Sequence, residues 1–340
     1  MSPFRSSKNN ITSSSSSVRA VAGRDTLGAS IGRNNAFETW TYGNYRYYSF
    51  TGDGFFEVLR SGPIDVALIG GGGAGGGGNY GGGGGAGAFV ENYGVTFPTG
   101  KYDVVIGRGG QGGRGTNYVT YSGGTSKLVG PSNFTDITAV GGSRGAGPGT
   151  AAEEGKGSGG GGYASVAYSY AGDIRYGSPG GNGKPLGGGG GGGAGSPGST
   201  YNPQNDYVFP PASTPINSPS NTGMLGGEGR SMFGGDLGIP ENYGYNTPAT
   251  PYAANGRHFA GGGGGGDNSI VYTGYVRLPG GGGVVGGTAE YRNPTNPGRP
   301  LYEGKPNTGS GGAGNSTSSY VSGKGGDGIL IIRIPIVFAE

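Results

Sequence analysis

Residue patterns typical of acid–base or nucleophilic catalysis are scarce in this sequence. His258 is the only histidine, so a His-based catalytic triad would have to recruit one serine and one aspartate from many. Glu153 and Glu154 are adjacent, which favours a solvated turn over two carboxylates that face one substrate. The chain has no cysteine and therefore no disulfide or thiolate metal site. We expect no enzymatic activity, no cofactor and no metal site.

Glycine-rich nucleotide motifs give no functional signal in this chain. GxGxxG matches recur because 89 of the 340 residues are glycine, and none opens a helix after a strand. Gly155-Lys156 and Gly183-Lys184 are followed by Gly and Pro instead of Ser or Thr, which excludes a phosphate loop. The formal net charge is only +3 and no stretch concentrates Lys and Arg. We therefore expect no nucleic-acid partner.

Aromatic residues that lie close to proline and asparagine are the best candidates for recognition. Three segments have this composition: Thr200–Asn221, Leu237–His258 and Glu290–Pro306. Tyrosine and phenylalanine on a chain stiffened by proline offer a large amphipathic contact area, as in a paratope. The residues that we predict to contact a receptor are Tyr201, Tyr207, Phe209, Tyr243, Tyr245, Tyr252, Tyr291 and Tyr302. The alternative is that these rings cap the protein's own scaffold or fill contacts between subunits.

Short runs of β-forming residues must position those segments. Tyr45–Phe50 and Phe55–Leu59 flank the turn residues Gly52-Asp53-Gly54, which predicts a hairpin. Ile64–Ile69 follows as a third strand. Near the other end of the chain, Ile329–Ile334 is an apolar strand that emerges from glycine. It must pair with the early strands across a long insertion, because an exposed apolar strand would aggregate.

Several predicted strands run directly into glycine. The junctions are Ile69-Gly70, Ile106-Gly107 and Val140-Gly141, so one end of the predicted sheet feeds a glycine-rich layer. The resulting division of the chain is an extended N-terminal arm at 1–36, a strand-rich domain at 37–140 plus 328–340, and a glycine-rich layer at 141–327, joined by glycine runs 70–87 and 107–115.

The glycine-rich layer is expected to be ordered. Hydrophobic residues make up 31% of the chain and charged residues only 13%, the reverse of a typical disordered chain. The glycine runs lack the collagen period and any other fixed repeat. Extended helices with three residues per turn leave every N–H and C=O free, and without Cβ atoms they can approach and bond one another. We predict such polyglycine II helices, with Ala74, Asn79 and Tyr80 at edges and turns.

The order of these motifs resembles the glycine-rich domain of phage tail-fibre and virion proteins. The resemblance rests on Asp65–Gly70 with its glycine run, on Gly100–Gly107 and on Gly325–Arg333, and covers residues 42–335. It implies an antiparallel, jelly-roll-like β-sandwich that carries a polyglycine II bundle, with essentially no α-helix. Fibre-tip adhesins of T-even-like phages are more loosely similar. The chain departs from many relatives in its tyrosine- and proline-rich inserts and in lacking a recognisable fibre shaft or chaperone domain.

The resemblance implies a phage virion surface protein, a tail-fibre or tail-tip component that attaches to the host cell through the aromatic segments. Its expected partners are other virion proteins, through residues 1–36, and a host glycan or outer-membrane protein. The alternative is a purely structural virion protein that decorates or cements capsid or tail. The sequence shows no Sec-type signal and no membrane span, which fits a virion protein that becomes extracellular on lysis. By analogy with fibres we expect a homotrimer.

Overall fold

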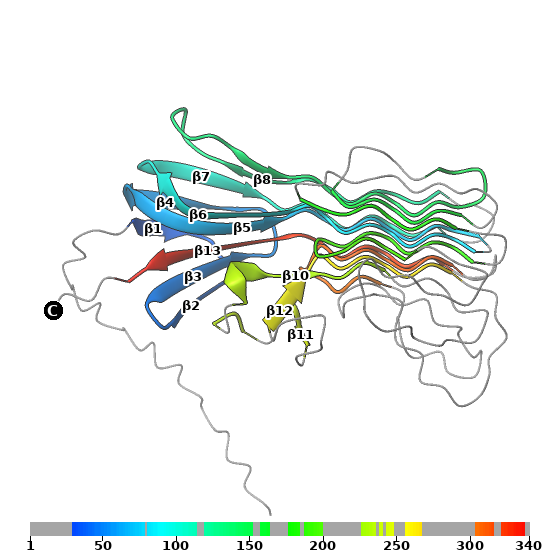
Figure 1. Cartoon of the computed structure of the whole chain (residues 1–340). Helices are drawn as coiled ribbons and strands as arrows, with labels where there is room; N and C mark the ends of the chain where they lie inside the picture. The colour runs from blue at the N-terminus through cyan, green and yellow to red at the C-terminus, as the bar shows by residue number, and fades with distance from the viewer. Residues whose placement is uncertain are drawn as a thin grey trace, which may run out of the picture.

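The computed structural model is an all-β protein with two parts, a sandwich of strands and a bundle of extended glycine-rich segments that continues from one end of it (Figure 1). We call the end of the bundle remote from the sandwich the tip, and the end of the sandwich remote from the bundle the base. The structure describes residues 29–78, 80–113, 119–151, 157–163, 176–183, 187–199, 226–235, 238–240, 243–247, 256–266, 303–315 and 321–336.

Two five-stranded sheets, with antiparallel pairing throughout, face each other in the sandwich. Sheet A consists, in spatial order, of β1 (Ser30–Asn34), β4 (Gly54–Arg60), β7 (Gly100–Val105), β8 (Ser126–Val129) and β9 (Ile137–Ala139). Sheet B consists of β2 (Glu38–Tyr42), β3 (Tyr45–Phe50), β13 (Ile329–Pro335), β5 (Gly62–Ile69) and β6 (Phe89–Phe97). The predicted antiparallel all-β fold is confirmed.

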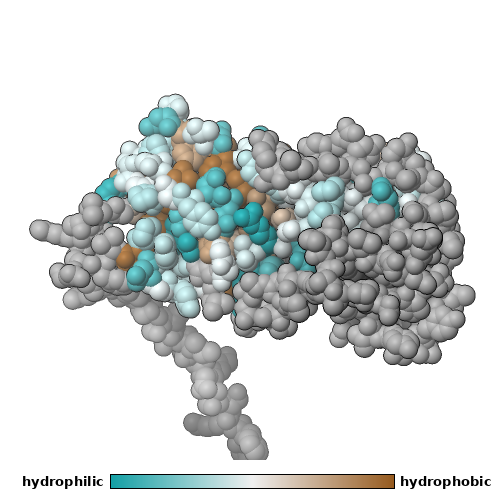
Figure 2. All heavy atoms as spheres, in the orientation of Figure 1, coloured by the Kyte–Doolittle hydropathy of each residue, from teal (hydrophilic) through white to brown (hydrophobic). Residues whose placement is uncertain are grey.

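The space between the sheets is filled by side chains that alternate along each strand. In β4, Phe56 and Val58 are buried and Leu59 is exposed, as expected for strands with one face on a core. The ring of Phe56 stacks on Tyr102 of β7 with centroids 5.1 Å apart. On the face of the molecule in Figure 2, hydrophobic residues gather over the sandwich, whereas the described bundle surface beside it is pale or hydrophilic.

The last strand completes sheet B, as its sequence predicts. β13 lies between β3 and β5 and pairs with both, so it joins the two ends of the chain across the insertion. Ile329, Leu330, Ile331 and Ile332 are all completely buried. Both faces of this strand are therefore covered, which explains an apolar run without alternation.

The predicted hairpin between Tyr45–Phe50 and Phe55–Leu59 is wrong. β3 belongs to sheet B and β4 to sheet A, so the turn between them crosses from one sheet to the other. The crossing lets Phe50 and Phe56 both face the core, with ring centroids 5.9 Å apart. Asp53 fixes the crossing, because its Oδ1 accepts a hydrogen bond from Ile106 N at 2.9 Å.

Two boundaries also differ from the predicted division of the chain. Residues 30–34, assigned to the arm, form β1 and pair with β4 of sheet A. Part of the insertion forms a third, three-stranded sheet, which we call the cap. It contains β10 (Arg230–Ser231), β12 (Gly256–Phe259) and β11 (Tyr245–Thr247), with the short 3-10 helix η1 (Met232–Gly234).

The glycine-rich segments bond one another with a repeat of three residues. Amides 70, 73 and 76 donate to segment 82–88, amides 71 and 74 to segment 121–124, and amides 72 and 75 to segment 323–326. Three residues per turn, an extended backbone and no internal hydrogen bonds are the features of polyproline II geometry. Segment 70–76 is therefore a polyglycine II helix.

This helix is the centre of a hexagonal lattice. Its carbonyls accept hydrogen bonds from three more segments, at 110, 142–145 and 312–315, so that six segments surround it. These six segments also bond one another in turn and close a ring. Segments 81–88 and 187–193 are the centres of two further rings that share members with the first. Backbone groups that no sheet could pair are thus satisfied inside the bundle.

Glycine is required wherever a Cβ would strike the backbone of a neighbouring helix. A Cβ on Gly75 would lie 1.9 Å from the carbonyl oxygen of Ala313. The lattice nevertheless encloses isolated small side chains, and Ala74 is completely buried, so its predicted place at an edge is wrong. Its methyl group is small enough to be enclosed between helices. Tyr80 lies in a turn at φ 62°, as predicted, and Asn79 lies outside the described residues.

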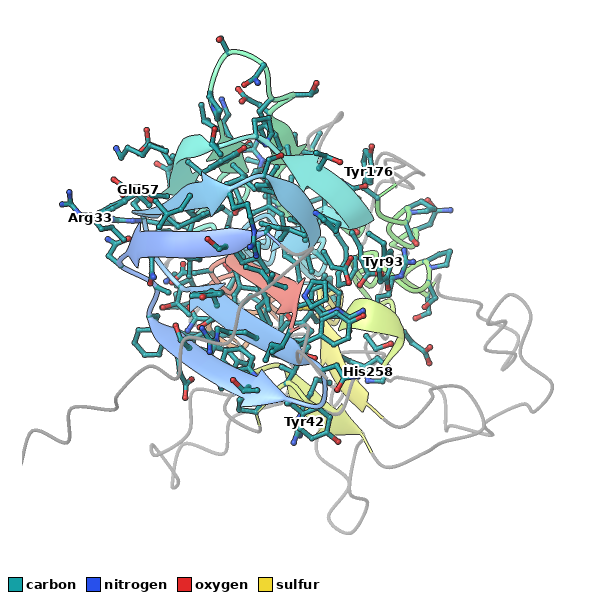
Figure 3. All side chains as sticks on the ribbon, turned by 90° about the vertical axis from the view of Figure 1, so that its left-hand side faces the viewer. Arg33, Tyr42, Glu57, Tyr93, Tyr176 and His258 are labelled. Atoms are coloured by element: carbon teal, nitrogen blue, oxygen red, sulfur yellow. The ribbon has the colours of Figure 1, made fainter. Side chains whose placement is uncertain are left out.

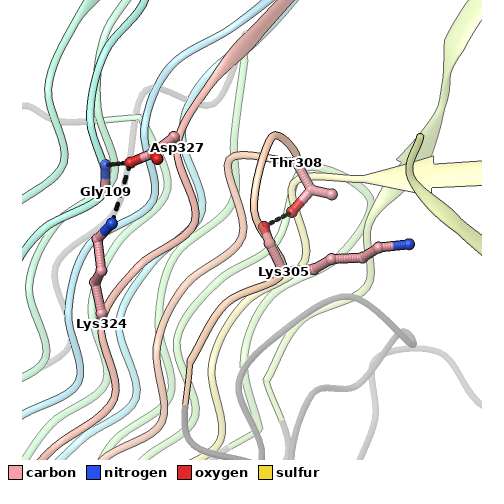
Figure 4. Close-up of polar contacts among 5 residues, drawn as sticks. All are labelled: Gly109, Lys305, Thr308, Lys324 and Asp327. Atoms are coloured by element: carbon pink, nitrogen blue, oxygen red, sulfur yellow. Dashed lines mark hydrogen bonds and ion pairs between the residues drawn. The ribbon is translucent and has the colours of Figure 1, made fainter. Parts of the chain in front are cut away.

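Side chains also bond to backbone amides of the lattice. Ser126, Asp327 and Ser322 accept hydrogen bonds from the amides of Gly107, Gly109 and Gly113, at 2.9, 2.7 and 3.0 Å. Asp327 also pairs with Lys324 at 3.5 Å, and nearby the Thr308 hydroxyl donates to the Lys305 carbonyl at 2.6 Å (Figure 4). At Gly107, Gly109 and Gly113 a side-chain oxygen thus takes the place of a backbone carbonyl as acceptor.

Replacing a lattice glycine should unfold the bundle. In Gly263→Val the new Cβ would lie 2.0 Å from Gly312 O, so we expect a loss of about 3 kcal/mol or more of unfolding free energy. The control is Gly52→Val, because Gly52 is exposed and a Cβ there meets nothing within 4 Å. Thermal unfolding followed by circular dichroism measures both. Equal stability of the two variants would contradict the lattice.

Candidate functional surface

Several described lattice segments end at the tip. Segments 107–113, 260–266 and 309–315 each run from the sandwich towards the tip, where their described residues end (Figure 1). At this end Gly266 bonds to Gly81 and Gly81 bonds to Asn315. The sequences that follow, 114–118, 267–302 and 316–320, lie outside the described residues. The last described residues of two segments, Gly266 and Asn315, therefore bond to the same residue, Gly81.

The described chain begins and ends at the base. Ser30, the first residue of β1, faces Arg60, and Pro335, the last residue of β13, faces Tyr45. All four residues lie at strand ends remote from the bundle, the end that faces the viewer in Figure 3. The two ends of the molecule therefore differ: the described chain begins and ends at the base, and several described lattice segments end at the tip.

The cap covers the half of sheet B's outer face that lies nearer the bundle. Its apolar residues Met232, Phe233 and Phe259 pack with Ile331 and other outward-facing residues of the sheet. Sequence reasoning missed the cap and placed Leu237–His258 among displayed loops. The sequence signal for the cap was the β13 segment, because an apolar run without alternation predicts that both faces of a strand are buried.

Tyr243 belongs to the contact between the cap and sheet B. Its side chain is 3% exposed, and its ring stacks on Trp40 with centroids 5.7 Å apart. Its hydroxyl donates to Glu38 Oε2 at 2.8 Å and shares a 2.7 Å hydrogen bond with Ser49 Oγ. Burial raises the pKa of Tyr243 well above its usual value, and the Glu38 hydrogen bond acts in the same direction. Tyr243 therefore packs on the protein's own scaffold, which was the alternative to a receptor contact.

The other predicted contact residues are not brought together by the described structure. Tyr245 lies in β11 with its backbone opposite His258, and its side chain is outside the described residues. The remaining predicted contacts also lie outside the described residues: Tyr201, Tyr207, Phe209, Tyr252, Tyr291 and Tyr302.

Arg333 of β13 links sheet B to the cap. Its Nε bonds to Asp65 Oδ2 at 2.8 Å, and the two side chains are only 11% and 13% exposed. The guanidinium lies 4.3 Å from the ring centroid of Tyr45 and 4.4 Å from that of Phe233, in cation–π contact with both. Phe233 has a left-handed φ of 49°, and its amide donates to Glu91. Burial and the Glu91 carboxylate raise the pKa of the adjacent Tyr93 to about 12, so that its hydroxyl is neutral.

The described residues include the single histidine, His258, and several Asp and Glu side chains. Among them, no group of three or more His, Cys, Asp or Glu side chains could hold a metal ion. His258 is 7% exposed and lies in β12, where its backbone faces Ser231 and Tyr245. Within the same residues, no helix is long and apolar enough to cross a membrane.

A sandwich whose strands continue into a polyglycine II lattice defines a class of glycine-rich scaffold proteins. Residues 51–335 match the glycine-rich domain family, and the chain belongs to that family. The match includes the strands from β4 to β13 and the whole described bundle. No curated protein matches the sequence.

Removing the Tyr243 hydroxyl should destabilise the cap. Tyr243→Phe leaves the buried Ser49 hydroxyl and the Glu38 carboxylate without this partner, at a cost of about 1–2 kcal/mol. Chemical denaturation measures the loss. Tyr121→Phe is the control, because Tyr121 is 58% exposed and should change stability by less than about 0.5 kcal/mol. Equal effects of the two changes would contradict the buried network.

Arg333→Met should cost about 3 kcal/mol or more, because it leaves Asp65 buried without its cation. The control is Lys101→Met, which removes an exposed partner of Asp103 and should cost less than about 1 kcal/mol. Adding Asp65→Asn to the Arg333 variant should recover part of the loss in the same denaturation assay. No recovery would show that the stacking of Arg333, and not its ion pair, dominates.

Proposed function

We propose that this chain is a phage virion surface protein, a tail-fibre or tail-tip component that attaches to the host cell through aromatic segments at the tip of the bundle. The base, where the described chain begins and ends, holds the protein on the particle through residues 1–29, the part of the predicted arm that precedes β1. The tip presents the binding segments to a host glycan or outer-membrane protein. The protein acts on the virion and, after lysis, outside the cell.

The observation that supports this proposal is the separation of the two ends. Recognition usually resides in loops on a rigid scaffold, and a lattice in which six helices bond each central helix is such a scaffold. Segments 197–199 and 260–266 run from the sandwich side towards the tip, as their bonds to Gly190 and Gly81 show. The sequences that follow them contain Tyr201, Tyr207, Phe209 and Tyr291. These four residues, and not the buried Tyr243, form the proposed contact set.

A purely structural role on capsid or tail is the second candidate. The observation that favours it is Tyr243, a tyrosine of a predicted recognition segment that instead packs within the chain. If the tip aromatics behave in the same way, they cement the protein to itself or to neighbouring virion proteins.

Binding of the purified, fluorescently labelled chain to a panel of bacterial strains tests the proposal by flow cytometry. We expect saturable binding to the host strain. Combined Tyr201→Ala, Tyr207→Ala, Phe209→Ala and Tyr291→Ala changes should weaken it about tenfold or more, since aromatic residues dominate binding energy. Tyr121→Ala, an exposed tyrosine on the side of the bundle, is the matched control and should bind as the wild type does.

Circular dichroism must first show that all variants are folded. Absence of binding to every strain, with normal incorporation into particles, would favour the structural role. Equal loss of binding in the tip variant and in the Tyr121 control would contradict a contact set at the tip.

A further inference from the structure

Strand β2 is the least protected of the four edges of the two large sheets. Natural sheets guard their edges with bulges, charged residues, proline or very short strands. On sheet A, β1 pairs irregularly with β4 and contains Arg33, and β9 is only three residues long. On sheet B, the far edge β6 is broken by an irregularity opposite Ile64 and Val66.

β2 has no bulge and no proline, and its one charged side chain, Glu38, is turned towards the cap, where it accepts the Tyr243 hydrogen bond. Its five residues, Glu-Thr-Trp-Thr-Tyr, pair with β3 in unbroken register and include no lysine, arginine or proline. Thr39, Thr41 and Tyr42 are exposed, and Phe37, just before the strand, is 68% exposed. Threonine, tryptophan and tyrosine are strong β-formers. The edge is therefore flat, accessible and suited to an additional strand.

We propose that β2 pairs with β2 of a second copy of this chain, antiparallel and about a two-fold axis at Trp40, to join the two B sheets into one. Pairing that uses all five residues places Trp40 opposite its own copy and Thr39 opposite Thr41 of the partner subunit. Glu38 then faces Tyr42 of the partner subunit. Cross-strand threonine pairs are favourable, whereas like charges directly opposite one another are unfavourable.

The charge of Glu38 selects this antiparallel pairing over a parallel one. In parallel pairing in register, Glu38 would face Glu38 of the partner subunit, which is unfavourable. In antiparallel pairing each Glu38 keeps its hydrogen bond from Tyr243 and meets an aromatic side chain. The same surface patch serves both copies, as a two-fold interface requires.

The pairing also fixes the direction of the two bundles. β2 runs from the bundle side at Glu38, opposite Ser49, to the base at Tyr42, opposite Tyr45. Antiparallel pairing therefore points the two bundles in opposite directions and leaves both tips open. The inference uses only residues of the sandwich.

Sedimentation velocity of the full chain over a range of concentrations tests the dimer. We expect the mass to rise from one copy to two as concentration increases. A Thr39→Lys/Thr41→Lys variant places introduced lysines opposite one another across the axis and should stay monomeric. A Thr39→Glu/Thr41→Glu variant should also stay monomeric for the same reason.

Mixing the lysine and glutamate variants provides the decisive measurement. Every introduced lysine then faces an introduced glutamate, so the mixture should recover the two-copy species that neither variant forms alone. Thr138→Lys, an exposed position on edge strand β9, is the control and should dimerise as the wild type does. A wild type that stays monomeric or forms trimers, or a mixture that does not recover, would overturn the proposal.

Discussion

Everything in this molecule depends on how backbone amides and carbonyls are satisfied in segments that are neither helix nor sheet. An extended glycine segment has no internal hydrogen bonds, so each of its polar groups needs a partner on another segment. One neighbour on each side, as in a sheet, would leave groups open along a three-fold helix. The closed ring around segment 70–76 supplies six neighbours. The same demand explains the composition, because a side chain at Gly75 would strike Ala313.

The sandwich and the bundle are one continuous structure. β5, β7 and β9 pass directly, or after one residue, into lattice segments that begin at Gly70, Gly107 and Gly141. Sheet pairing brings these strand ends together, and this proximity lets the lattice begin without a separate nucleation step. In return, Ser126 bonds to both Ile69 and Gly107 and ties the two sheets where the lattice begins. Neither part would be complete without the other.

The strands and the glycine bundle could be predicted from the sequence because their patterns leave few alternatives. An apolar run such as that of β13 must be buried, and long glycine runs with little charge must pack on one another. The hairpin prediction was wrong because Gly52-Asp53-Gly54 can turn the chain within a sheet or between sheets, and only the core at Phe50 and Phe56 decides between them. Tyr243 could not be separated from the other candidate tyrosines, because its burial depends on Trp40 and Ser49, about 200 positions earlier. Ala74 shows that a buried methyl group is compatible with the lattice.

The way in which late segments complete the lattice also governs how the protein can form. The amide of Gly109 is bonded by Asp327, which lies 218 positions further along the chain. Arg333, which holds the cap, pairs with Asp65 across 268 positions. Contacts of such sequence separation form slowly, because a long loop must close before they contribute. The first glycine helices therefore cannot complete their backbone hydrogen bonds until the C-terminal strand has left the ribosome. A nascent chain is consequently exposed to self-association for the whole time of its synthesis, and its rate of production becomes part of what decides whether it folds.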